Sequence, residues 1–105
     1  MVMCTHTDIV KNDPAMIKAF LQVHRRATEF ALANRAAFVE MCEQKLGLPA
    51  KTVELAAPNI ELTWRIDDDW VTRAKYYGSQ MLEKKQIRQL LNYGSFINSS
   101  FVKSI

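Results

Sequence analysis

The longest periodic pattern in the chain follows Asp13, where large apolar residues recur every three or four positions. Asp13 is a favourable N-cap and Pro14 suits the first helical position, so the pattern predicts a helix of about twenty residues. Lysine, arginine, glutamine and glutamate fall on its polar side. Each large apolar side chain contributes roughly 1.5–3 kcal/mol when buried, so the stripe is expected to need a partner surface. The stripe consists of Met16, Phe20, Val23, Ala27 and Phe30.

Two further helices are predicted from their stop signals. The first runs from about Arg35 to Leu46 and ends at Gly47, because glycine adopts the left-handed conformation at little cost. The second is short, from Pro49 to Ala57, and Pro58 forbids its continuation.

A fourth helix opens at Asp67-Asp68-Asp69, whose carboxylates meet the positive end of the helix dipole. An acidic run also suggests a cation site, but no glycine-centred loop or later glutamate is in register, so helix capping is the favoured interpretation. The pattern weakens after Gln86, and Asn98-Ser99-Ser100 could cap one short terminal helix. The buried stripe of the fourth helix is predicted to be Trp70, Ala74, Tyr77 and Met81.

Two segments have an extended pattern. Residues Val2 to Thr7 predict a β-strand, and Ile60 to Ile66 alternate between apolar and polar residues as in an edge strand or an extended connection. A lone strand leaves its backbone groups without partners. We therefore expect a homodimer that pairs through the N-terminal strand. The predicted fold class is mostly α, a single domain over residues 1–105 with four to five helices, an N-terminal β-strand and one short extended segment.

Composition and charge narrow the classes of protein. Of 105 residues, 49% are hydrophobic, which predicts a packed fold. The net charge of +3 is small, and acidic and basic residues are interleaved, so we expect no nucleic-acid partner. No stretch is long enough to cross a bilayer, and residues Met1 to Val10 do not resemble a signal peptide. As written, the chain is expected to be cytoplasmic and not inserted in a membrane.

The candidate catalytic and metal-binding residues are few. Cys4 and His6 would project from the same face of the predicted strand, but two ligands of different type are a weak signal for a metal. A cysteine–histidine nucleophile would need a third, orienting group, and the sequence supplies none. Cys42 and His24 lie among apolar residues, where they are expected to be structural. We therefore expect no enzyme activity, no catalytic residue, no metal and no cofactor.

Four aromatic residues cluster near the second extended segment and the fourth helix. They could stack a ligand or a base, but their apolar volume favours a place in the core. They are Trp64, Trp70, Tyr76 and Tyr77.

The order of these motifs resembles a known family. The matching segments are Asn12 to Phe20, Arg26 to Asn34, Glu43 to Pro49, Ala57 to Ile60 and Phe96 to Val102. In this order they resemble the C-terminal portion of the substrate-binding proteins of ABC importers for nitrate, sulfonate, taurine and bicarbonate, which include thiamine-precursor relatives. The resemblance spans nearly the whole chain.

The resemblance implies a type II periplasmic binding protein fold, in which two α/β lobes close on a ligand and deliver it to an ABC permease. This chain would be a fragment of one lobe, with Cys4 to Thr7 nearest the cleft and the ligand-binding residues unknown. Such a fragment is expected not to bind ligand alone, because the ligand cleft closes only when the other lobe supplies its second wall. Only the full-length parent, periplasmic or extracytoplasmic, would meet the permease.

Two alternatives stay open. One is a standalone helical protein-interaction module with an apolar groove. The other is a weak nucleic-acid-binding module, which would bind through the basic residues Lys18, Arg25, Arg26, Arg35 and Lys45.

Overall fold

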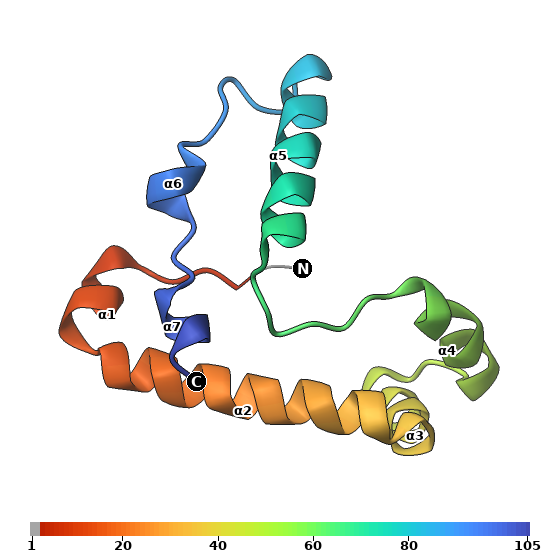
Figure 1. Ribbon diagram of the computed structural model, residues 1–105. Coiled ribbons are helices and arrows are strands. Elements are labelled where there is room, and N and C mark those ends of the chain that lie inside the picture. Colours follow the sequence, from red (N-terminus) through yellow and green to blue (C-terminus); the bar gives the residue numbers. More distant parts are fainter. Residues whose placement is uncertain (1–2) are drawn as a thin grey trace. The chain divides into compact units, whose positions relative to one another are not determined.

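The computed structural model describes residues 3–105, and the chain divides into two compact units, Met1–Trp64 and Arg65–Ile105. The second unit contains α5 (Asp68–Glu83), α6 (Tyr93–Phe96) and α7 (Ser100–Lys103). The single domain predicted over residues 1–105 stays a prediction. The first unit contains the helices α1 (Thr7–Asn12), α2 (Pro14–Ala33), α3 (Arg35–Leu46), α4 (Ala50–Ala56) and the 3₁₀ helix η1 (Ala57–Asn59) (Figure 1).

The predicted N-terminal β-strand is wrong. Residues 3–6 form no strand, no strand occurs elsewhere in residues 3–105, and α1 begins at Thr7. Val2 lies outside the described residues. The His6 carbonyl oxygen accepts the N–H groups of Ile9 at 3.1 Å and Val10 at 3.2 Å, which starts a helix. The local helical bonds form because a strand would need a ladder partner that the described part of the chain does not offer.

The number of helices also exceeds the prediction. Residues 3–105 contain seven α-helices where four to five were expected. The break at Asp13-Pro14 separates α1 from α2, and the terminal segment forms two short helices, α6 and α7.

The helix ends follow the predicted signals. Asp13 Oδ1 accepts the Met16 N–H at 3.0 Å, and Asp67 Oδ1 accepts the Trp70 N–H at 2.8 Å. Gly47 ends α3 with a φ of 65°. The capping interpretation of Asp67 is therefore confirmed.

The segment from Ile60 to Ile66 is an irregular connection without strand pairing. Its exposure still alternates: Leu62, Trp64 and Ile66 are half-buried, whereas the polar residues between them are exposed. Ile60 departs from the pattern, because it is 55% exposed.

The buried core is small. Val39 on α3 and Val53 on α4 are the buried hydrophobic residues of the described chain, and Thr28 on α2 is the buried polar one. The Arg35 guanidinium also donates to the Glu54 carbonyl oxygen at 3.1 Å, which ties α3 to α4. The chain exposes 8607 Å², whereas two separate compact units of these sizes would expose about 7,200 Å² together. Large apolar side chains contribute to this exposed surface, among them Leu46 at 66% and Leu55 at 69% exposed.

Candidate functional site

The clearest unusual surface is one face of α2. Met16 is 50% exposed, Phe20 59%, Val23 63% and Phe30 49%, and Ala27 is exposed as well. We call these five residues the outer stripe. The less exposed residues of α2 lie on the neighbouring face and are Ile17, Leu21, His24, Arg25, Thr28 and Ala31. The predicted stripe is therefore present on the helix, and its side chains are exposed.

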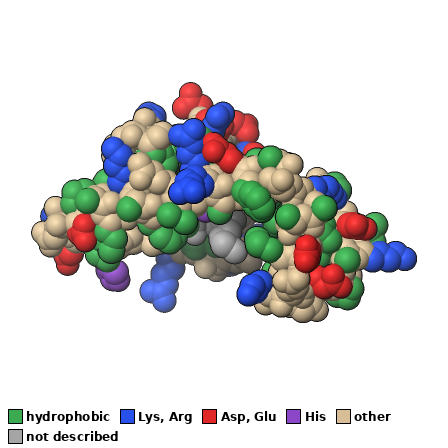
Figure 2. All heavy atoms as spheres, turned by 90° about the horizontal axis from the view of Figure 1, so that it is seen from below, with side chains coloured by type: hydrophobic (Ala, Val, Ile, Leu, Met, Phe, Trp, Pro, Cys, Tyr) green, Lys and Arg blue, Asp and Glu red, His purple; other side chains and the backbone are tan. Residues whose placement is uncertain are grey.

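The spacing of the outer stripe is regular. Its members follow one another at intervals of four, three, four and three residues. This is the seam spacing of helices that pack side by side as a coiled coil. Hydrophobic side chains are also visible on the surface in the space-filling view from below, between charged ones (Figure 2).

A shallow depression of about 550 Å³ lies on the same helix. It is lined by Val23, Arg26, Ala27, Glu29 and Phe30. Four of these, Val23, Arg26, Ala27 and Phe30, stand at i, i+3, i+4 and i+7, which is the arrangement of a hole that accepts one side chain of a facing helix. Because all five belong to one helix, the depression cannot enclose a small molecule.

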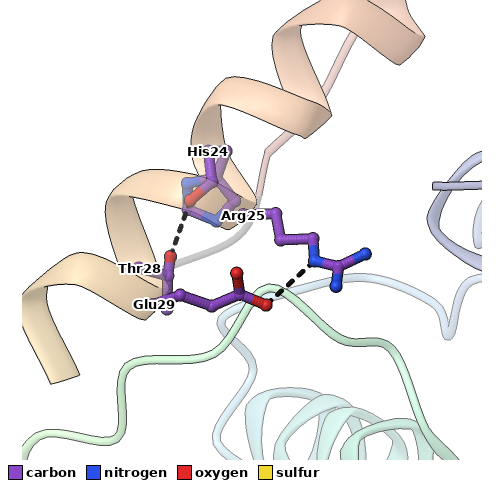
Figure 3. A network of polar contacts seen from close by, with 4 residues as sticks. All are labelled: His24, Arg25, Thr28 and Glu29. Carbon is purple, nitrogen blue, oxygen red and sulfur yellow. Dashed lines mark hydrogen bonds and ion pairs between the residues drawn. The ribbon is translucent and has the colours of Figure 1, made fainter. Parts of the chain in front are cut away.

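The polar contacts along α2 are structural. Arg25 Nε lies 2.9 Å from Glu29 Oε1, and the Thr28 hydroxyl donates to the His24 carbonyl oxygen at 2.9 Å (Figure 3). The Arg25 guanidinium carbon also lies 4.5 Å from the centre of the Trp64 ring, a cation–π contact. These contacts satisfy buried Thr28 and hold the chain after η1 against α2. They bring no nucleophile and base together.

The candidate metal and nucleophile residues are dispersed. Cys4 is exposed, and His6 is the N-cap residue of α1, so the shared strand face predicted for them does not form. His24 and Cys42 are half-buried on α2 and α3. Among residues 3–105, no three histidine, cysteine, aspartate or glutamate side chains are placed to hold a metal ion.

The four aromatic residues do not form the predicted core. Trp64 and Trp70 are half-buried, but Tyr76 and Tyr77 are 59% and 64% exposed. The two tyrosine rings meet edge to face, with centroids 5.6 Å apart. This pair is adjacent in sequence on α5, so at most one of its rings could share a helix face with Trp70.

Two of the five candidate basic residues are engaged in local contacts. Arg25 pairs with Glu29, and Arg35 donates to a backbone carbonyl. Lys18 and Arg26 lie elsewhere on α2, and Lys45 lies near the end of α3. The absence of a nucleic-acid partner stays a prediction.

The second unit has its own hollow of about 560 Å³ at the start of α5. Asp67 and Asp68 line it together with Lys75 and Lys103, so its charges offset one another. The Asp67 carboxylate already caps α5. The hollow therefore defines no class of ligand.

No helix within residues 3–105 has the length and apolar character to span a membrane. Comparisons of the chain with protein-family models, curated proteins and solved structures give no match. The outer stripe of α2 is thus the surface on which a function has to be argued. The sequence predicted the residues of the outer stripe. It did not predict that their side chains are exposed, because periodicity alone does not say whether a partner surface exists.

Proposed function

We propose that this chain is the helical portion of one lobe of an ABC-importer solute-binding protein for small anions or related solutes, without catalytic activity of its own. The motif order described above supports this proposal. So do two helix boundaries within the matching segments, since Asp13 caps the start of α2 and Gly47 ends α3. In this proposal the assembled two-lobed protein acts outside the cytoplasmic membrane and delivers solute to an ABC permease.

The observation that carries the proposal is the exposure of the outer stripe. Phe20 and Val23 are 59% and 63% exposed, although large apolar side chains at helical spacing normally pack against a core. A lobe of an α/β protein offers such a core in its sheet. The chain alone lacks the second wall of a ligand cleft, so it is expected not to bind solute by itself.

A chimera tests this proposal. This chain would replace the corresponding C-terminal portion of a characterised sulfonate-binding protein, and sulfonate binding would be measured by calorimetry. We expect the chimera to fold and bind. The matched control carries Val23→Glu in the chimera, which should prevent docking of α2 and abolish binding. A folded chimera that binds no solute, or one that does not fold, contradicts the proposal.

A second candidate function is a standalone helical protein-interaction module. The regular spacing of the outer stripe and the one-helix depression at Ala27 favour it, because both are features of a surface that accepts another helix. A synthetic amphipathic helix with an apolar seam should shift the amide resonances of the outer stripe. An unchanged spectrum at high peptide excess contradicts this function.

A further inference from the structure

The geometry of α2 points to one occupant. We infer that the outer stripe pairs with the same stripe of a second copy of this chain. The two α2 helices run antiparallel, and Met16 of each copy enters the depression at Ala27 of the other. This inference goes beyond the proposed function, because it requires neither a solute nor a transporter. In the proposed function the outer stripe packs against the sheet of the lobe, so the pairing applies to the chain when that sheet is absent.

A helix is the favoured occupant because of the stripe's period. Intervals of four and three residues keep a seam facing a second helix over two heptads. The depression supplies the matching hole, with Val23 and Phe30 at its ends and Arg26 on its rim. The exposed, flexible side chain of Met16, which lies on the same stripe nearer the start of α2, is suitable to fill this depression in the second copy.

The register follows from size and symmetry. When Met16 faces Ala27 of the second copy, Phe20 faces Val23, and the two-fold axis repeats both pairs. Each of these facing pairs then joins a longer side chain to a shorter one, Met16 to Ala27 and Phe20 to Val23. A parallel pair would instead place Ala27 against Ala27 and leave the depression unfilled. Antiparallel helices also align their dipoles favourably.

Charge does not oppose this pairing. The outer stripe contains no charged residue, and Arg26 is the one charged residue of the depression's rim that adjoins the seam. In the proposed register Arg26 lies beside the region of Ala19 of the second copy, where no like charge meets it. Phe30 comes opposite Asp13 of the second copy, whose exposed carboxylate caps the start of α2 at the edge of the interface. The two central pairs therefore bury no unpaired charge.

The size of the interface predicts a weak dimer. Five half-exposed side chains from each copy would bury about 900 Å² in total, slightly below the roughly 1,000 Å² of a stable interface. We expect a dissociation constant in the micromolar range.

Sedimentation equilibrium across the micromolar range tests the pairing with a matched pair of variants. Val23→Glu changes an outer-stripe residue that is 63% exposed, and Leu32→Glu changes a residue of α2 that is 62% exposed but lies off the stripe. We expect Val23→Glu to raise the dissociation constant by roughly 100-fold, because the charge is buried at two symmetry-related places. Leu32→Glu should leave the constant within about threefold. Both positions are exposed, so both variants should keep the helical circular dichroism signal.

Disulfide trapping tests the register in a Cys4→Ser, Cys42→Ser background. The combination of Met16→Cys and Ala27→Cys should form a covalent dimer under mild oxidation, whereas Met16→Cys alone should not, because the two Met16 positions lie far apart in an antiparallel pair. Efficient trapping by Met16→Cys alone would show a parallel pair and overturn the register.

The remaining outcomes also decide the inference. A monomer at all concentrations overturns it, and so does a dimer that withstands Val23→Glu. A dimer that is lost only when residues 3–6 are replaced would place the contact in the N-terminal segment instead. The chimera experiment is independent, since solute binding by the chimera does not require the 105-residue chain to dimerise.

Discussion

The hydroxyl group of Tyr93 lies against α5 where a side chain at Gly78 would begin. A Cβ atom at position 78 would overlap the Tyr93 hydroxyl oxygen and would lie 3.3 Å from Tyr93 Cζ and 3.7 Å from a methyl carbon of Leu90. The absence of a side chain at Gly78 therefore lets the segment after α5 fold back onto this helix. No described residue of the second unit is buried, so this contact between α5 and the terminal segment is a tight one in a loosely packed unit.

Gly78→Ala should destabilise the second unit by roughly 1–3 kcal/mol, because overpacking outweighs the gain in helix propensity of about 1 kcal/mol. Urea denaturation measures the change. Tyr93→Phe removes the overlapping hydroxyl, so Gly78→Ala should cost clearly less in that background. Gly94→Ala is the control, because a Cβ there meets Asn92 Oδ1 at an ordinary 3.5 Å. Equal losses at both glycines would contradict the packing described.

Lys85→Gly should stabilise the chain by about 0.5–1 kcal/mol. Lys85 has a φ of 57°, its N–H donates to the Leu82 carbonyl oxygen at 3.0 Å, and the Gln86 N–H donates to the Met81 carbonyl oxygen at 2.8 Å. This is a Schellman ending, in which glycine is favoured at the left-handed position. Thermal unfolding measures the gain. Lys84→Gly is the matched control: its φ is −80°, so glycine there should lower stability.

Asp67→Ala should lower the stability of α5 by about 1 kcal/mol, because the Trp70 N–H loses its acceptor. The helical circular dichroism signal during thermal unfolding measures the loss. Asp69→Ala removes a carboxylate two residues further on, which pairs on the surface with Arg73 at 3.1 Å, so it should cost at most about 0.5 kcal/mol. A larger effect at Asp69 than at Asp67 would argue against the cap.

Val53→Ala should cost roughly 1.5–3 kcal/mol, because it leaves a cavity in the small core that α3 and α4 form. Val53 is 6% exposed, whereas Leu55 on the same helix is 69% exposed. Leu55→Ala should therefore change stability by no more than about 0.5 kcal/mol. Urea denaturation of both variants makes the comparison, and a similar loss at the two positions would contradict the core assignment.

The sequence predicted the helix ends better than the packing. Asp13, Gly47 and Asp67 act through hydrogen bonds and backbone angles within one turn, so their roles could be read locally. The end of α5 was less clear, because Lys85 occupies a position where glycine is expected. The strand predicted over Val2 to Thr7 failed because strand formation depends on a distant partner, whereas the His6 carbonyl oxygen finds helical donors three and four residues away.

The outer stripe shows the same limit. Helical spacing correctly placed Met16, Phe20 and Val23 on one face, but it could not say what covers that face. Likewise, apolar volume suggested a core position for Tyr76 and Tyr77, and both are exposed. Burial is a property of the assembled surface, so it is the part of the candidate site that required the structure.

The placement of the two tryptophans gives each unit its own optical reporter. Trp64 lies in the first unit beneath the guanidinium of Arg25, and Trp70 lies near the start of α5 in the second. A Trp64→Phe variant would therefore emit from the second unit alone, and a Trp70→Phe variant from the first. Fluorescence melting curves of these two variants would coincide if both units lose structure together and would separate if one outlasts the other.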